Sequence, residues 1–156
     1  MIISEQFITF EINNRFFAFE AKNVIEIFVN KTINPIPIAP DYVVGIINFR
    51  GEIVSVIDIS VKFDLKENKQ TENKYIIVTT LFDDNKHLKL ACLCDNVHRI
   101  ETINFAEIQQ VPSFGTYFNP DFLKGVFYLN QELYTIINIE KVFKSNVEFA
   151  IEKIIE

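Results

Sequence analysis

Cysteine is scarce in this chain of 156 residues, where Cys92 and Cys94 are the only two. Two thiols do not provide the disulfide framework of a small secreted protein, and their scarcity agrees with a reducing compartment. No apolar run approaches the roughly 20 residues that a membrane helix needs. Residues 1–11 lack the basic and apolar segments of a secretory leader. We therefore expect a cytoplasmic protein.

Basic residues are outnumbered, with 15 Lys and Arg against 21 Asp and Glu and a net charge of −6. Because no run of Lys or Arg occurs, a nucleic-acid groove is disfavoured. The chain has only 4 glycines, and none of them belongs to a Gly-rich phosphate loop. With 49% apolar residues, a chain of this length buries a proper core, which argues against a disordered tail. We expect a folded protein whose partners are other proteins.

The first part of the chain is rich in apolar residues that recur with a period of two, which predicts β-strands. The expected strands are residues 7–12, 16–20 and 24–29. Asn13 and Asn14 tolerate a positive φ, so they suit a tight turn between the first two strands. These two strands should form a hairpin.

A second hairpin is predicted where Arg50 and Gly51 separate two apolar runs. These runs are residues 46–49 and 53–57. The Pro-rich residues 34–40 cannot donate regular ladder hydrogen bonds, so we expect an extended connector there. Pro40 should then open a short helical turn.

The second half of the chain repeats the first, which is the most informative internal feature of the sequence. The segment PDYVVG at residues 40–45 returns eighty positions later as PDFLKG at residues 120–125. Further matches are residues 52–53 with 132–133, 56–59 with 136–139, Phe63 with Phe143 and, more weakly, Val24 with Val97 and Ile27 with Ile100. The same strand–turn–strand–helix unit is therefore expected twice.

Two halves of about five strands each are too narrow for wide sheets, so closure into two small barrels is the most economical way to remove strand edges. We expect one barrel mainly from residues 15–64 and the other mainly from residues 75–138, with exchange of terminal segments possible. The polar residues 64–74 would link the two lobes. A single mixed sandwich is the alternative.

The C-terminal residues 145–156 are predicted to form an amphipathic helix. Ser145 and Glu148 have the spacing of a capping box. The residues on one face of the helix are Val147, Ala150, Ile151 and Ile154. Such a helix would cover a barrel or the seam between lobes, or else contribute to a partner interface.

The residues from Tyr42 to Ile59, YVVGIINFRGEIVSVIDI, resemble the signature of the CheW chemotaxis coupling proteins, usually an Asn-Leu-Arg-Gly turn followed by Ile-Val-Pro-Val-Ile-Asp-Leu. The similarity extends from about Phe7 to Phe143. It implies a single CheW-like domain over residues 1–156, with two intertwined SH3-like five-stranded β-barrels, short helices and a C-terminal amphipathic helix. The chain departs from the family pattern at Phe49, Ser55, Ala91 and Cys94, where Leu, Pro, Gly and Val are usual.

The resemblance implies a non-enzymatic adaptor without a cofactor or metal. It would couple the cytoplasmic tip of methyl-accepting chemoreceptors to the regulatory domain of a CheA-type histidine kinase. The protein would act in the cytoplasm, peripheral to the inner membrane through receptor arrays. The alternatives are an adaptor for a non-chemotaxis receptor–kinase system and a small-molecule-binding or enzymatic β-barrel that uses the cleft between lobes.

By the same resemblance, the receptor is expected to dock in the groove between the barrels. The expected receptor-binding residues are Val24, Glu26, Ile27, Gly45, Arg50, Ala91, Val97 and Ile100, and the expected kinase-binding residues are Arg50 and Gly51. Ile27 and Val97 also fit simple core packing, and Gly45 also fits a backbone turn after Pro40. Kinase contacts should further use the ends of both barrels.

Arg50 is expected at an exposed hairpin tip, where its guanidinium offers a carboxylate a planar fork of donors. In the family the matching Glu and Arg lie close together. We therefore predict a contact between Glu26 and Arg50 that orients the arginine. The alternative is two unrelated solvated charges, since an exposed salt bridge contributes only about 0–1 kcal/mol.

A catalytic or metal site finds little support. The metal-like residues are His87, Cys92, Cys94 and His98. Both cysteines share strand parity with Leu88 and Leu90, so they should face the core rather than bind zinc or act as nucleophiles. Residues 83–85 fit a hairpin turn, and Asp58, whose repeat counterpart is Asn138, fits a helix cap. We expect no enzymatic activity.

Overall fold

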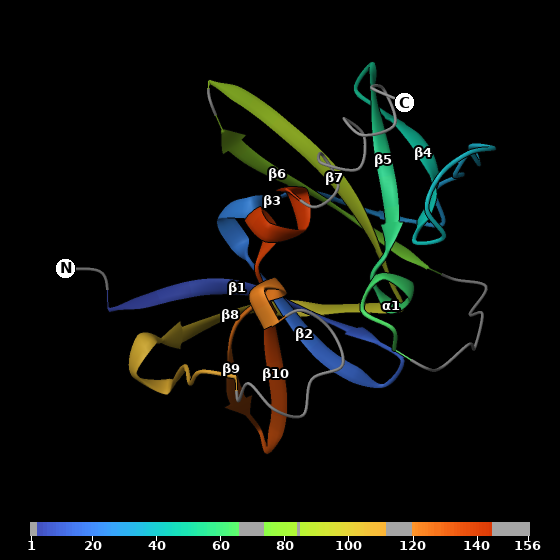
Figure 1. Ribbon diagram of the computed structural model, residues 1–156. Coiled ribbons are helices and arrows are strands. Elements are labelled where there is room, and N and C mark those ends of the chain that lie inside the picture. Colours follow the sequence, from blue (N-terminus) through green and yellow to red (C-terminus); the bar gives the residue numbers. More distant parts are fainter. Residues whose placement is uncertain (1–2, 66–73, 84, 112–119, 145–156) are drawn as a thin grey trace.

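The computed structural model describes residues 3–65, 74–83, 85–111 and 120–144. These residues form ten strands and a few short helices (Figure 1). The strands are β1 (Ser4–Ile12), β2 (Arg15–Glu20), β3 (Val24–Val29), β4 (Val43–Phe49), β5 (Glu52–Asp58), β6 (Tyr75–Asp83), β7 (Lys86–Cys94), β8 (Asn96–Asn104), β9 (Leu123–Leu129) and β10 (Glu132–Ile137). The helical segments are η1 (Ala21–Asn23), α1 (Ile59–Lys62), η2 (Phe105–Glu107), η3 (Pro120–Phe122) and residues 139–144.

The strands form two five-stranded sheets, which confirms the predicted fold class. Sheet I has the order β3-β6-β7-β5-β4, and sheet II has the order β8-β1-β2-β10-β9. Neighbouring strands are antiparallel except for two parallel pairs, β5 with β7 and β2 with β10. Each half of the chain therefore gives its first two strands to one sheet and its last three to the other.

The strands divide between the sheets differently from the predicted ranges 15–64 and 75–138. Sheet I takes β6 and β7 from the second range, and sheet II takes β2 from the first. The physical reason is that each N-terminal hairpin finds its parallel neighbour in the other half of the chain. The segments that exchange are thus whole hairpins, and the two barrels are intertwined.

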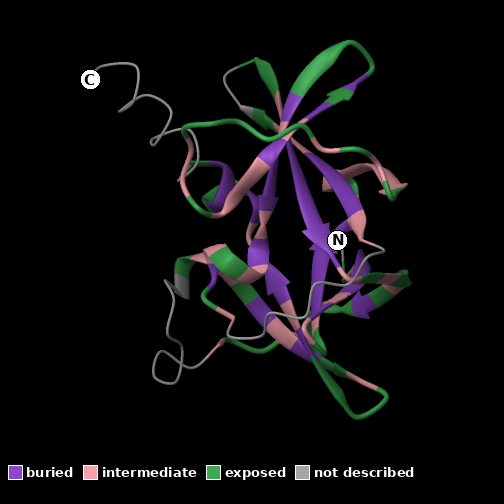
Figure 2. Cartoon of the chain, turned by 90° about the vertical axis from the view of Figure 1, so that its right-hand side faces the viewer, coloured by how far each residue is buried: buried purple, intermediate pink, exposed green. Residues whose placement is uncertain are grey.

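One hydrophobic core is shared by both sheets. Its buried residues are Phe10, Ile12, Phe17, Phe19, Ile57, Ile59, Phe63, Ile77, Leu90, Cys92, Cys94, Ile137, Ile139, Val142 and Phe143. Smaller clusters fill each sheet separately, with Val56 in sheet I and Phe127 in sheet II as fully buried members. Figure 2 shows the buried residues concentrated along the strands between the exposed hairpin tips. Because burial of each large apolar side chain contributes about 1.5–3 kcal/mol, this shared core ties the two sheets into one unit.

Short helices meet where the two halves of the chain are in contact. Phe63, directly after α1, stacks on Phe122 of the second half with ring centroids 5.4 Å apart. The Lys62 ammonium lies 3.9 Å from the Tyr42 ring centroid and 5.3 Å from that of Phe122. Since Tyr42 and Phe122 are counterparts in the repeat, one lysine contacts an equivalent ring from each half.

The predicted hairpins are confirmed by their backbone angles. Asn13 and Asn14 have φ values of 52° and 62°, and β1 and β2 pair across them. Arg50 and Gly51 have φ values of 50° and 83° between β4 and β5. Two successive positive φ values are what a two-residue turn between right-twisted strands requires. The predicted turn at residues 83–85 also lies between paired strands, β6 and β7, although residue 84 lies outside the described residues.

The Pro-rich connector is anchored at both ends. Asn34 exchanges two backbone hydrogen bonds with Ile46, at 2.9 and 2.8 Å. Pro40 opens a single turn, in which its carbonyl accepts from the Val43 N–H at 3.0 Å. Only the repeat counterpart, η3, is helical.

Two predicted segments lie partly or wholly outside the described residues. The expected linker includes residues 66–73, and the expected C-terminal helix comprises residues 145–156. In the part of the chain that the structure describes, no helix has the length and apolar character needed to cross a membrane.

Candidate functional site

Arg50 and Glu26 form the predicted contact. Glu26 lies on β3, an outer strand of sheet I, and Arg50 lies at the tip of the β4–β5 hairpin. Arg50 Nη2 is 3.5 Å from Glu26 Oε1, and the two side chains are 69% and 39% exposed. The long distance and the exposure indicate that this pair contributes little to the stability of the fold.

Arg50 lies against a pair of contacting aromatic rings that was not predicted from the sequence. The Arg50 guanidinium carbon is 4.7 Å from the centroid of the buried Phe49 ring. Phe28 of β3 meets Phe49 edge-on, with centroids 6.0 Å apart. Lys31 lies over Phe28, its ammonium 4.4 Å from the ring centroid. The departure from Leu at position 49 was the available signal, because only an aromatic ring offers a face to a cation.

The four apolar docking residues expected on β3 and β8 lie on strands that each form one edge of a sheet. Val24 and Ile27 on β3 and Val97 on β8 are half-buried and pack against the shared core. Ile100 is 58% exposed. The sequence repeat that relates Val24 to Val97 and Ile27 to Ile100 is therefore matched in the structure, because β3 and β8 occupy equivalent edge positions in their sheets.

Gly45 and Ala91 are buried, so neither offers a surface to a partner in this structure. A Cβ on Gly45 would lie 2.2 Å from the Asn34 carbonyl oxygen. Close backbone approach therefore explains this glycine, and the alternative of a turn after Pro40 does not. Ala91 lies in β7 opposite Val56 and Val78, within the core of sheet I.

The two hairpin ends that repeat each other expose apolar side chains. Beside Gly51, whose N–H donates to Asn48 Oδ1 at 3.0 Å, Ile53 is 74% exposed. At the β9–β10 end, Tyr128 and Leu133 are also exposed. Contacts were expected at both ends, but none of these three residues was predicted as a contact. The repeat, which aligns Ile53 with Leu133, was the available signal for those two residues.

Cys92 and Cys94 are buried in the shared core, which confirms their predicted orientation. Burial strongly raises the pKa of the Cys92 thiol and raises that of Cys94 to about 12. Such thiols stay protonated at neutral pH and are poor nucleophiles. His87 packs on Phe82, and His98 lies 3.4 Å from Glu11, both away from the cysteines. Nowhere in the described ranges do three or more metal-binding side chains cluster.

Asp58 caps a helix, as predicted. Its Oδ1 accepts from the Ser60 N–H at 2.9 Å and from the Ser60 hydroxyl at 2.6 Å. Its counterpart Asn138 accepts from the Lys141 N–H at 3.2 Å. Both side chains thus satisfy backbone donors at a helix start.

An ion pair with a nearly buried carboxylate distinguishes sheet II from sheet I. The nearly buried Glu20 of β2 accepts from Lys124 of β9 and lies 3.2 Å from Lys22. Ala18 pairs with Ile136 in sheet II as Ala91 pairs with Val56 in sheet I. By this equivalence, the repeat counterparts of Glu20 and Lys124 are Leu93 and Val44, which are apolar. Burial favours the neutral carboxyl, but hydrogen bonds from Lys124 and its other neighbours outweigh it and lower the pKa of Glu20.

Comparison with known proteins gives one consistent answer. Residues 6–147 match the family model described as a CheW-like domain. The chain is 27% identical over 143 residues to the chemotaxis protein CheW of Treponema pallidum, covering 90% of this chain and 82% of that protein. It is 29% identical over 140 residues to the chemotaxis protein CheW of Rhizobium meliloti, covering 90% and 88%.

A solved structure has the same fold. The crystal structure of the scaffolding protein TtCheW from Thermoanaerobacter tengcongensis superposes with a TM-score of 0.77 at 24% identity, covering 87% of this chain and 90% of that one. With the match to the family model over residues 6–147, the described architecture identifies the chain as a member of the CheW-like domain family.

Proposed function

We propose that this protein is a non-enzymatic chemotaxis adaptor that couples transmembrane chemoreceptors to a CheA-type histidine kinase. The family match over residues 6–147 supports this proposal, as do the relatives named chemotaxis protein CheW and the solved neighbour named a scaffolding protein. The main structural support for the proposal is Arg50, which is exposed at a hairpin tip and contacts Glu26 and the Phe49 ring.

The receptor site that we propose lies along the outer strands of the two sheets. Its contact residues are Val24, Glu26, Ile27, Arg50, Val97 and Ile100, with the buried Gly45 and Ala91 shaping the site through packing. Apolar contacts would supply most of the binding energy, because a few buried aliphatic or aromatic anchors usually dominate an interface. Glu26 and Arg50 would fix the orientation.

The kinase site that we propose includes Arg50 and Gly51 and extends to the ends of both sheets. Exposed Ile53 at one end and Tyr128 and Leu133 at the other provide apolar anchors of similar but unequal shape. Two such surfaces on one unit with a shared core suit a molecule that holds two partners at a fixed geometry. Bound to receptors in this way, the protein would work in the cytoplasm beneath the inner membrane.

Co-sedimentation tests the proposal. The purified protein is mixed with receptor-containing membranes and the cognate CheA-type kinase, and kinase autophosphorylation is measured in the same tubes. We expect the protein to bring the kinase to the membranes and to change its activity, and Arg50→Glu to weaken both effects. Binding to neither partner would contradict the proposal and direct the search to another receptor–kinase system or to a small ligand.

A further inference from the structure

Two cations lie over two contacting aromatic rings at the outer edge of sheet I. Lys31 follows β3, and its ammonium is 4.4 Å from the Phe28 ring centroid. Arg50 follows β4, and its guanidinium carbon is 4.7 Å from the Phe49 ring centroid. The two rings meet at 78° with centroids 6.0 Å apart. We call Lys31 and Arg50 the cationic pair.

The rings hold the cationic pair in place. Phe49 is 2% exposed and belongs to the core of sheet I, so its ring provides a fixed support. Phe28 packs against the same core. A cation held against a ring face loses part of its side-chain freedom before any partner arrives, which reduces the entropy lost on docking. The N–H donors that do not face the rings remain available.

The cationic pair has unused capacity to bind carboxylates. Glu26 approaches Arg50 through Nη2, at 3.5 Å, which is not the close two-point geometry that a guanidinium fork can form. Among residues 3–65, 74–83, 85–111 and 120–144, no ion pair includes Lys31. In a chain of net charge −6, two cations that lie over contacting rings, with one carboxylate beside Arg50, form a local excess of positive charge.

We infer that the cationic pair recognises two carboxylates on the receptor, which makes Lys31 a specificity-determining residue alongside Arg50. This inference rests on the proposed function and adds the chemistry of the partner, namely an acidic segment at the cytoplasmic tip of the chemoreceptor. Continuity supports the receptor as the occupant, because Val24, Glu26 and Ile27 of the proposed receptor site lie on β3, four to seven residues before Lys31. Phe49 contributes as a positioning residue for Arg50.

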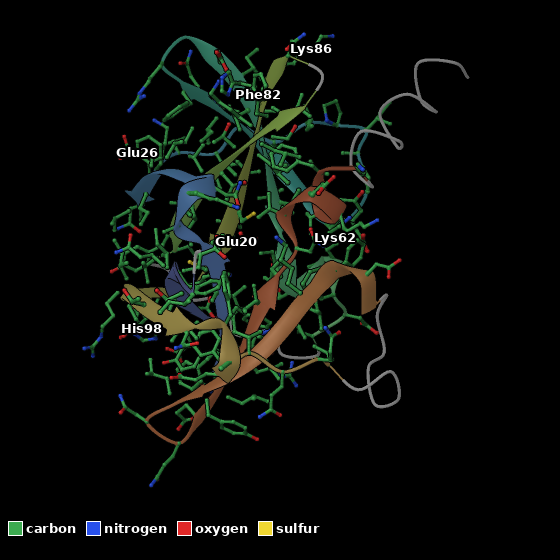
Figure 3. All side chains as sticks on the ribbon, turned by 90° about the vertical axis from the view of Figure 1, so that its left-hand side faces the viewer. Glu20, Glu26, Lys62, Phe82, Lys86 and His98 are labelled. Atoms are coloured by element: carbon green, nitrogen blue, oxygen red, sulfur yellow. The ribbon has the colours of Figure 1, made fainter. Side chains whose placement is uncertain are left out.

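Charge reversal at Lys31 tests the inference against a matched control. The control is Lys86→Glu, because Lys86 is exposed at the tip of the β6–β7 hairpin, away from Glu26 (Figure 3). Binding of the full chain to a receptor cytoplasmic-tip fragment and, separately, to the CheA regulatory domain is titrated at low and high salt. We expect Lys31→Glu to weaken receptor binding about three- to tenfold, while Lys86→Glu leaves it unchanged.

Two further variants separate charge from structure. Lys31→Met keeps an apolar stem over Phe28, so it should weaken receptor binding and also reduce its dependence on salt, because one screened charge is lost. Phe49→Leu should weaken receptor binding while Arg50 keeps its charge. Thermal melting of each variant confirms that it folds.

The outcomes distinguish this inference from the proposed function. If Lys31→Glu and Lys86→Glu both bind the receptor fragment as tightly as the unchanged protein, the inference is wrong and the proposed function stands. If Lys31→Glu loses only kinase binding, the assignment of the cationic pair to the receptor is wrong. If the unchanged protein binds neither partner, the proposed function itself fails.

Discussion

Two glycines show how a single residue can be fixed by the backbone of another segment. A Cβ on Gly45 would lie 2.2 Å from the Asn34 carbonyl oxygen, and one on Gly125 would lie 2.8 Å from the Gln109 carbonyl oxygen. Both distances are too short for any side chain. Gly45 and Gly125 are repeat counterparts, so the same crossing of a connector over a strand occurs once in each sheet.

Gly45→Ala is therefore expected to destabilise the protein. The added methyl group must push the connector away from β4, at a cost of about 1–3 kcal/mol. Gly51→Ala is the matched control, because a methyl group at this position meets no other atom within 4 Å. Its cost comes only from the φ of 83°, which alanine adopts less readily than glycine, and is about 1 kcal/mol. Urea denaturation followed by circular dichroism measures both. Equal stability of Gly45→Ala and the unchanged protein would contradict the crossing.

At the scale of elements, the Glu20–Lys124 pair joins β2 to β9 across 104 residues of sequence. Removing Lys124 leaves the nearly buried Glu20 carboxylate with Lys22 at 3.2 Å, and removing Glu20 leaves the 43%-exposed Lys124 ammonium partly in solvent, so each loss should be about 1–3 kcal/mol. The equivalent place in sheet I holds Leu93 and Val44. We therefore expect Glu20→Leu and Lys124→Val each to destabilise the protein, and the double variant to recover most of that loss. Denaturant unfolding of all four proteins measures the coupling, and additive losses would argue against it.

The Glu20–Lys124 pair also affects how the free energy of unfolding changes at acid pH. The folded-state pKa of Glu20 lies below its ordinary value of 4.5 because hydrogen bonds outweigh the effect of burial. The stabilisation from ionised Glu20 is therefore fully present above the pKa that this residue has in the unfolded chain. It is lost as the pH falls through the pKa that Glu20 has in the folded protein. Burial raises the pKa of the neighbouring Glu5, which acts in the opposite direction. Glu20→Gln should flatten the fall in stability below about pH 4.5; an unchanged acid limb in the melting profile would contradict this assignment.

Turns and helix caps could be predicted because they depend on neighbouring residues, whereas the pairing of distant strands could not. Asn13 and Asn14 at one turn and the cap at Asp58 follow from the chemistry of neighbouring residues. The Glu26–Arg50 contact came from family resemblance, because spacing alone does not bring β3 and β4 together. The exchange of hairpins was not predictable in detail, since the alternation in β2 fits pairing with either half, and only the parallel pairing of β2 with β10 decides it.

At the scale of the whole molecule, the shared core predicts that both sheets unfold together. Cys92 and Cys94 report on this event, because they lie in sheet I within the core that both sheets bury. Their protonated, inaccessible thiols should react with a thiol reagent only after global opening, since burial raises the pKa of both.

Phe127→Ala places the perturbation in sheet II, far along the chain from the two thiols. Loss of this buried ring should destabilise the fold by about 3–5 kcal/mol. Because the intertwined sheets share one core, thiol labelling of Cys92 and Cys94 should speed up in proportion to the fall in global stability measured by circular dichroism. Lys86→Glu, an exposed change on β7, the strand that bears both cysteines, should leave labelling unchanged. Labelling in Phe127→Ala that stays at the original rate would show that sheet I holds together without sheet II.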